Sequence, residues 1–365
     1  PNNAYELEEQ AKRFDNEEKH EESFKIRLKA ADMENVISIS NLGWHYQYGY
    51  GVEQDYEKAF SYYKKAADMG NAWAQNKTGI FYNNGYGCEE NEAMAFSYFM
   101  KAAEQEESEA EYWVGMCYKN SWGVSEDYEK AYSWFLKAHK NGYVGGTREL
   151  AYCLWTGSGC AANKGRAKGL WNEAANKDDA QSACYLGDAH IEEGNNNKAF
   201  FYLNKAYKLG WMDAASNLSL CLEMGWGTQK NYRRAVEVLE ANLDEHPEYY
   251  VQLGKIFFPL GTEYQNYTKA AQYFQKAVDH EYVEGYFMLG MCYSEGYGVP
   301  KNKEKAKELL QVAADNGHAD AQELLNDISK KEGYIDTAKK IGKGALGLLG
   351  AFAQGYAQAS SNMYY

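Results

Sequence analysis

The sequence predicts an all-α fold: a right-handed α/α superhelical solenoid built from helix-turn-helix repeats. Three observations predict it: a small residue that recurs at nearly constant spacing, an alanine at a fixed distance after it, and a turn region that ends in Asp or Asn. Self-similarity at such a period is the signature of a repeat architecture. Hydrophobic residues make up 45% of the 365 residues, which is enough for a core and excludes a largely disordered chain.

A small residue, which we call the anchor, recurs in eight places that are mostly 36 residues apart, and in seven of them it follows an apolar residue. The anchors are Gly43, Gly79, Gly115, Ala151, Gly187, Ser219, Gly254 and Gly290. An alanine follows each anchor after sixteen residues, except in the fifth repeat, where it comes four residues early. Two antiparallel helices that touch closely need small residues where they cross, so each repeat is predicted to be a helix hairpin.

Between the two helices of most repeats lies a glycine loop, such as Gly49-Tyr-Gly51-Val. A glycine just past a helix end supplies the left-handed backbone that other residues resist. An Asp or Asn then stands four residues before the alanine in every repeat and is predicted to be the N-cap of the second helix. These caps are Asp55, Asn91, Asp127, Asn163, Asn195, Asn231, Asn266 and Asn302. The fifth repeat lacks the glycine loop and should have a tighter turn, and Pro259 should end the first helix of the seventh repeat early.

Together these residues resemble the Sel-one-like repeat, a relative of the tetratricopeptide repeat. The first repeat shows the pattern as Leu42-Gly43, Tyr46, the glycine loop, Lys58-Ala59 and Ala66-Ala67. Eight such repeats cover residues 36–318. The resemblance implies a solenoid whose first helices line a concave surface, and proteins of this kind serve as adaptors in signalling, secretion, host interaction and protein quality control.

The flanking segments complete the predicted organisation. Residues 1–35 are expected to form an N-terminal capping helix pair, and residues 319–328 a C-terminal capping helix, because the ends of a solenoid otherwise leave an apolar face in water. Residues 329–365 form a basic, Gly/Ala-rich amphipathic tail of net charge +3, whereas the whole chain carries −14.

The tail has an apolar face that we predict to be a docking surface. Its residues are Leu348, Leu349, Phe352 and Tyr356, which share one side of a helix. The tail could dock on the solenoid, anchor at a membrane interface or bind a partner, but its apolar core is too short to span a bilayer. We expect it to bind protein before lipid, at the C-terminal end of the solenoid or in a second copy of the chain, which would make an oligomer.

The sequence offers no sign of catalysis. The seven His are scattered without metal-ligand spacing, and no nucleophile–base pair or phosphate loop is present, so we expect a non-enzyme with no metal and no cofactor. The acidic balance argues against nucleic acid as a partner. The seven Cys are expected to be free and mostly buried, which, without a signal-peptide pattern in the given chain, favours a cytoplasmic location.

The candidate site is the concave groove that the resemblance places along the first helices. Its predicted partner-binding residues are Trp44, Asn76, Ile80, Asn83, Tyr112, Met116, Lys119, Arg148, Tyr152 and Trp155. Aromatic anchors with a few polar donors are typical of a peptide-binding surface, and Asn side chains can clamp an extended backbone. The alternative is that these residues only pack between neighbouring repeats.

The sequence therefore favours a non-enzymatic scaffold or adaptor that binds a peptide or partner protein in this groove. One alternative is a regulatory or immunity-type protein that occludes a partner enzyme. Another is a membrane-recruited assembly factor that uses the tail.

Overall fold

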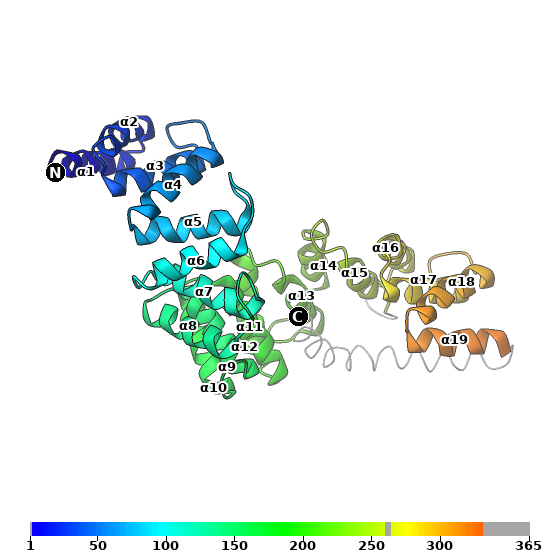
Figure 1. Cartoon of the computed structure of the whole chain (residues 1–365). Helices are drawn as coiled ribbons and strands as arrows, with labels where there is room; N and C mark the ends of the chain where they lie inside the picture. The colour runs from blue at the N-terminus through cyan, green and yellow to red at the C-terminus, as the bar shows by residue number, and fades with distance from the viewer. Residues whose placement is uncertain (1, 260–263, 331–365) are drawn as a thin grey trace. The chain divides into compact units, whose positions relative to one another are not determined.

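The computed structural model describes residues 2–259 and 264–330, which fold into nineteen helices and no strand (Figure 1). This confirms the predicted all-α fold of helix-turn-helix repeats. The chain divides into two compact units, residues 1–177 and 178–365, which we call the N-terminal and the C-terminal unit and describe separately. Residues 331–365 lie outside the described residues, and so do the predicted docking residues Leu348, Leu349, Phe352 and Tyr356.

The N-terminal unit contains ten helices, coloured blue to green in Figure 1. They are α1 (Asn2–Asn16), α2 (His20–Ala31), α3 (Val36–Tyr48), α4 (Tyr56–Asp68), α5 (Ala72–Asn84), α6 (Glu92–Ala103), α7 (Ser108–Asn120), α8 (Tyr128–Lys140), α9 (Val144–Thr156) and α10 (Lys164–Asn176). Each helix packs on its neighbours along the chain, so the unit is a stack of hairpins.

The described part of the C-terminal unit continues the same pattern. Its helices are α11 (Ala180–Glu192), α12 (Asn196–Lys208), α13 (Ala214–Met224), α14 (Tyr232–Glu240), α15 (Tyr249–Phe257), α16 (Tyr267–Asp279), α17 (Val283–Glu295), α18 (Lys303–Asp315) and α19 (Ala319–Lys330). The two predicted departures are confirmed. Only three residues separate α11 from α12 in the fifth repeat, and α15 ends at Phe257, three residues after its anchor, where α3 runs on for five.

The anchor glycines lie where the two helices of a hairpin cross, as predicted. A Cβ on Gly43 would lie 2.7 Å from the ring of Tyr63, and one on Gly79 would lie 2.6 Å from the ring of Phe99. The sequence predicted small residues on both helices. The structure shows that a large side chain, four residues after the alanine, fills the space beside the anchor glycine. The absence of a side chain at the anchor therefore lets a buried ring sit directly on the first helix.

The start and stop signals between the helices are also confirmed. All eight predicted Asp or Asn caps accept a hydrogen bond from the backbone N–H three residues later, as Asp55 does from Lys58 at 2.9 Å. Gly49 ends α3 with a left-handed φ of 72°. The second loop glycine, Gly51, lies against the carbonyl of His20 at the start of α2, so a side chain there would collide with the preceding hairpin.

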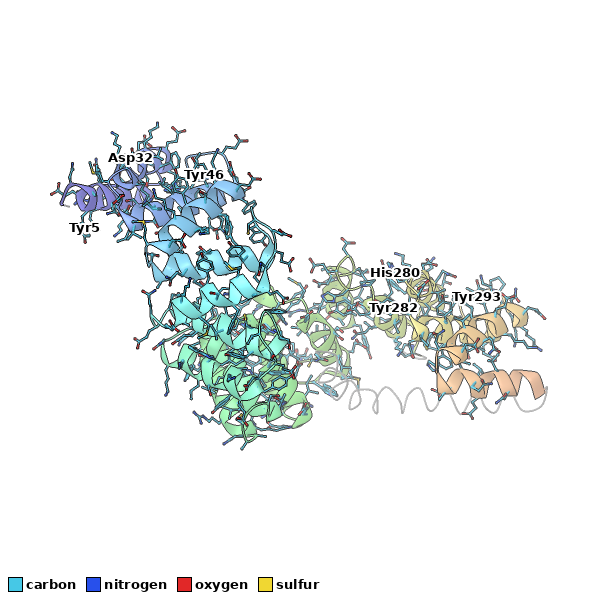
Figure 2. All side chains as sticks on the ribbon, in the orientation of Figure 1. Tyr5, Asp32, Tyr46, His280, Tyr282 and Tyr293 are labelled. Carbon is cyan, nitrogen blue, oxygen red and sulfur yellow. The ribbon has the colours of Figure 1, made fainter. Side chains whose placement is uncertain are left out.

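A second recurring contact joins the two helices of a hairpin through stacked rings. Tyr46 on α3, labelled in Figure 2, stacks on Tyr62 of α4 with ring centroids 5.6 Å apart. His190 occupies the equivalent position in the fifth repeat and stacks on Tyr202 at 5.8 Å. His190 is therefore a residue of the hairpin contact in this repeat.

The cysteines behave as small apolar groups. All seven are free, and five of them are buried. Burial raises the pKa of Cys117, Cys153, Cys221 and Cys292 to about 12, which keeps these thiols protonated at neutral pH. None of the helices in the described residues is long and apolar enough to cross a bilayer.

Candidate functional site

The ten predicted groove residues, which we call the stripe, all lie on first helices of the N-terminal unit. They are Trp44 on α3, Asn76, Ile80 and Asn83 on α5, Tyr112, Met116 and Lys119 on α7, and Arg148, Tyr152 and Trp155 on α9. Nine of them are half-buried, so each presents part of its side chain to solvent. Asn76 is fully buried and does not reach the surface.

The burial of Asn76 follows from its partner on the next repeat. Its Nδ2 donates to Glu109 Oε2 at 2.8 Å, and Lys77 Nζ contacts the same oxygen at 2.8 Å. The Oδ1 of Asn76 is also buried and has no hydrogen-bond partner. Asn76 on α5 therefore positions Glu109 of α7. For Asn76 to clamp an extended peptide, as the sequence suggested, the two helices would have to move apart.

Lys119 and Arg148 converge on one carboxylate. Glu149 on α9 is buried and accepts from Lys119 Nζ at 3.0 Å and from Arg148 Nε at 3.4 Å. Lys119 also lies 4.8 Å from the centroid of the Tyr152 ring, within the range of a cation–π contact. These two cations of the stripe are thus already engaged within the protein.

The aromatic residues of the stripe are held by neighbours but stay partly open. Trp155 lies 5.3 Å from Trp171, and Lys164 Nζ lies 4.3 Å from the centroid of the Trp155 ring. Tyr112 lies 5.2 Å from Tyr143, and its burial raises the pKa of its hydroxyl. Fixed rings that keep an open face provide contact area at little cost in side-chain entropy.

At the N-terminal end of the stripe, Trp44 belongs to a larger aromatic cluster that the sequence analysis did not single out. Its ring lies 4.7 Å from that of Tyr50 and 5.7 Å from that of Tyr48. Tyr48 is 54% exposed and Tyr50 39% exposed, so both rings are open to solvent beside Trp44. The sequence does contain a signal for Tyr50, because an aromatic residue between two glycines recurs in several of its loops.

A cavity of about 260 Å³ opens beside Trp44. We call it the N-terminal pocket, and its walls are Asp15 on α1, Arg27 on α2, Asn41 and Trp44 on α3, and Trp73 on α5. Only Trp44 was among the predicted site residues. The other four come from segments that the sequence analysis treated as a cap or as repeat scaffold.

Arg27 and Asp15, which line this pocket, belong to a largely buried network of charges. Arg27, which is 3% exposed, contacts Glu8 at 3.1 Å and Asp15 at 2.6 Å, and also donates to Ser23 at 2.8 Å. The same Nη1 of Arg27 also lies 2.8 Å from the Nε2 of His45. The two carboxylates and the guanidinium therefore carry a net charge of about −1 when all three are ionised.

The protonation of His45 follows from its two contacts. Its Nδ1 lies 2.6 Å from the carbonyl oxygen of Tyr50 and must donate there, so its Nε2 is left to accept from Arg27. Burial lowers the pKa of His45, and the adjacent positive charge acts in the same direction. His45 is accordingly neutral at pH 7 and adds no charge to the network.

The first helices of the C-terminal unit carry acids with different surroundings. Asp188 on α11 accepts from Asn217 at 2.6 Å, and burial raises its pKa to about 6. Glu223 on α13 is buried beside Ser219, and burial raises its pKa to about 8. Across the described residues, no three His, Cys, Asp or Glu side chains come together as metal ligands would.

The repeats identified above match the model of a known family, the Sel1 repeat. The eight matched segments are residues 36–71, 74–107, 108–143, 146–179, 180–211, 213–237, 247–282 and 283–318. The chain belongs to the Sel1 repeat family. Proteins of this family are generally scaffolds for protein interactions and are typically not enzymes.

Two kinds of relative illustrate the family. The DAP3-binding cell death enhancer 1 of Rattus norvegicus is 31% identical over an alignment that covers 40% of this chain and 36% of the relative, so the matched part is about a third of that protein. A Sel1 repeat protein from Oxalobacter formigenes has a similar structure, with a TM-score of 0.60, 25% identity, and coverage of 64% of this chain and 95% of that one. A protective antigen of uropathogenic Escherichia coli is also similar, with a TM-score of 0.47, 25% identity, and coverage of 93% of this chain and 83% of that one.

The Sel1 pattern accounts for the anchors, loops and caps but not for the N-terminal pocket. Glu8, Asp15 and Arg27 precede the first matched repeat, which begins at residue 36. The pocket is therefore formed where the segment before the repeats packs on the first Sel1 repeat and on Trp73 at the start of α5.

Proposed function

We propose that this Sel1 repeat chain is a non-enzymatic adaptor that binds a peptide or partner protein along the stripe of the N-terminal unit. The observation that carries the proposal is a row of half-buried aromatic and apolar side chains on four successive first helices. These are Trp44, Ile80, Tyr112, Met116, Tyr152 and Trp155. A contiguous series of this kind is a feature of interaction surfaces, whereas single exposed apolar residues are common on any protein.

The charges beside these residues support the same proposal. Lys119 and Arg148 both contact Glu149 inside the protein, which leaves the three groups with a net charge of about +1, so a partner that covers them does not bury an isolated cation. Asn83 is half-buried near the end of α5 and retains a side-chain amide that can donate and accept hydrogen bonds. The name of the rat relative describes it as binding another protein, DAP3, which agrees with a protein partner.

The test uses two variants with the same substitution in neighbouring repeats of the N-terminal unit. Met116→Glu places a charge in the stripe on α7, and Met94→Glu places the same charge on α6, where Met94 is 37% exposed and outside the stripe. We expect affinity capture with the full chain and with Met94→Glu to retain the same partners, and capture with Met116→Glu to lose them. Melting temperatures of both variants check that the fold is intact.

Other outcomes would separate this proposal from its alternatives. Partners that are retained by a folded Met116→Glu variant would show that the stripe is not the binding surface. A captured enzyme that loses its activity in the complex would fit the occlusion hypothesis. Flotation of the purified chain with liposomes, in the absence of any protein partner, would fit recruitment to a membrane.

A further inference from the structure

The N-terminal pocket has the size of a site for one side chain. Its volume of about 260 Å³ lies below the range of roughly 300–1,000 Å³ that is usual for drug-sized ligands. It lies beside Trp44, the first residue of the stripe, so a peptide that follows the stripe would place one of its residues at the mouth of this pocket. The residues of the walls determine which kind of side chain the pocket can bind.

The charge of the walls favours a cation. The charge network that includes Asp15 and Arg27 has two carboxylates, from Glu8 and Asp15, and one guanidinium, from Arg27. The His45 in contact with it is neutral. Arg27 is almost completely covered, whereas the Asp15 side chain is 23% exposed and its buried Oδ1 has no hydrogen-bond partner among the described residues, so Asp15 keeps an acceptor that a donor in the pocket can satisfy. Each of the three nitrogens of Arg27 already has a partner in Glu8, Asp15, Ser23 or His45, which leaves it poorly placed to hold an anion.

The hydrogen-bonding groups of the walls favour the same class of ligand. Asn41 donates through Nδ2 to Glu8 at 2.8 Å, which leaves its amide oxygen to accept. With the Asp15 carboxylate, the pocket therefore offers acceptors. Lysine and arginine side chains carry only donors, so they match such walls, whereas carboxylate and phosphate groups carry only acceptors at neutral pH.

Two indole rings complete the walls and add attraction for a positive charge. Trp44 and Trp73 both line the pocket. The Nζ of Lys77 already lies 5.7 Å from the centroid of the Trp73 ring, and it is neutralised by Glu109 at 2.8 Å, so this ring attracts cations within the protein itself. The exposed Tyr48 and Tyr50 extend the aromatic surface next to Trp44.

We propose that the N-terminal pocket binds the side chain of a lysine or arginine of the partner protein, between the Asp15 carboxylate and the indole rings of Trp44 and Trp73. This proposal rests on the proposed function and specifies it, because it assigns a basic residue to the partner segment that lies at the N-terminal end of the stripe. The acidic character of the whole chain, with a net charge of −14, assists the approach of a basic partner.

The test uses the indole N–H signals of the full chain labelled with ¹⁵N in its nine tryptophans. Trp44→Phe and Trp73→Phe variants assign the two signals of the pocket. The probe is Nα-acetyl-arginine amide, whose only charge is its side chain, at a pH of about 8, where the guanidinium is fully charged. We expect saturable shifts of the Trp44 and Trp73 signals, with a dissociation constant on the order of 10 mM that weakens as salt is added.

Matched probes and variants determine whether charge recognition is responsible. Nα-acetyl-citrulline amide has nearly the same shape without the charge and should bind about tenfold more weakly. Asp15→Asn should weaken arginine binding about fivefold, while Asp32→Asn, which removes an exposed acid from the same unit, should leave it unchanged. If Asp15→Asn fails to fold, Trp73→Leu should still weaken arginine binding and Trp155→Leu should not.

Several results would overturn this assignment. Nα-acetyl-glutamate amide shifting the two signals in place of the arginine probe would show an anion site at Arg27. Equal binding of arginine and citrulline probes, or no saturable shift with any probe, would show that the pocket does not recognise a cation. Shifts of the same signals on dilution of the chain alone would show that lysines of a second copy fill the pocket. Because the probes need no partner protein, this result is independent of the capture experiment with Met116→Glu.

Discussion

Both units of this chain bury carboxylates on their first helices, and individual carboxylates are accommodated in different ways. In the N-terminal unit, Glu149 is paired with Lys119 at 3.0 Å. In the C-terminal unit, Glu223 has a hydroxyl partner in Ser219, and burial raises its pKa to about 8. The same repeat therefore tolerates an acid in its interior either as one half of an ion pair or as a largely protonated group at neutral pH.

The C-terminal unit also contains an acid whose pKa is lowered, in contrast to that of Glu223. Glu284 on α17 contacts Lys255 at 2.8 Å and His318 at 3.0 Å. Burial alone would raise the pKa of Glu284, but the hydrogen bond from His318 and the charge of Lys255 outweigh it and lower the pKa to about 2. The identity of the partner, rather than the unit or the helix, thus decides how a buried or half-buried acid is accommodated.

The largest effect is expected where the two units are alike, at the helix crossings. Gly79→Leu would place four carbon atoms where even a Cβ lies 2.6 Å from the ring of Phe99, and should cost about 3 kcal/mol or more. Asn83→Ala, at the half-buried end of the same helix, should cost less than about 1 kcal/mol. Thermal melts of the two variants measure the difference. A Gly79→Leu chain that melts no earlier than Asn83→Ala would show that the crossing is not close-packed.

The second prediction concerns Glu223, which forms no ion pair with any residue that the structure describes. A carboxyl whose pKa is higher in the folded chain than in the unfolded one stabilises the fold below its unfolded pKa of about 4.5, and this contribution is lost as the pH rises through about 8. Glu223→Gln removes this titration while keeping a hydrogen-bonding side chain. The variant should match the parent near pH 5 and be several kcal/mol more stable near pH 9, by about 1.4 kcal/mol for each unit by which the fold raises the pKa of Glu223.

Glu284→Gln provides the opposite control in the same unit. The pKa of Glu284 is lower in the folded chain, so its stabilising contribution is present above about 4.5 and lost as the pH falls through about 2. The substitution should therefore destabilise the chain at pH 7 and have a smaller effect near pH 3. Denaturant melts across this range measure both variants. Parallel pH profiles for Glu223→Gln and Glu284→Gln would contradict the comparison.

The parts of the fold that the sequence predicted well are those set by short-range chemistry. An N-cap such as Asn91 needs only the backbone N–H three residues later, and a loop glycine such as Gly49 needs only its own backbone angle. Both signals are complete within a few residues and are repeated eight or nearly eight times. Consequently the helix boundaries could be predicted without knowledge of the tertiary contacts.

The candidate site was harder to predict because its chemistry comes from different repeats. Asn76 was expected at the surface and is buried, since Glu109 from the following repeat covers it. Asn41 and Glu8 pair in the same way, and both pairs are 33 residues apart, close to one repeat. Polar residues separated by about one repeat could thus have been recognised as neighbours. Arg27 could not, because a basic residue on a predicted capping helix is usually solvated and nothing local indicates its buried partners.

The smallest expected effect compares the same cap in the two units. Asn91 accepts from the N–H of Met94 at 2.9 Å, whereas Asn195, which follows the tight turn of the fifth repeat, accepts from the N–H of Lys198 at 3.4 Å. A longer hydrogen bond is weaker, so Asn91→Ala should cost about 1 kcal/mol and Asn195→Ala a few tenths of that value. Because a chain of two units need not unfold in one step, hydrogen exchange of the α6 and α12 amides measures each loss where it occurs. Asn91→Asp keeps the acceptor and should restore the protection of α6. Equal losses at both caps would show that the tight turn imposes no cost on capping, and that the glycine loop is not needed to orient the cap.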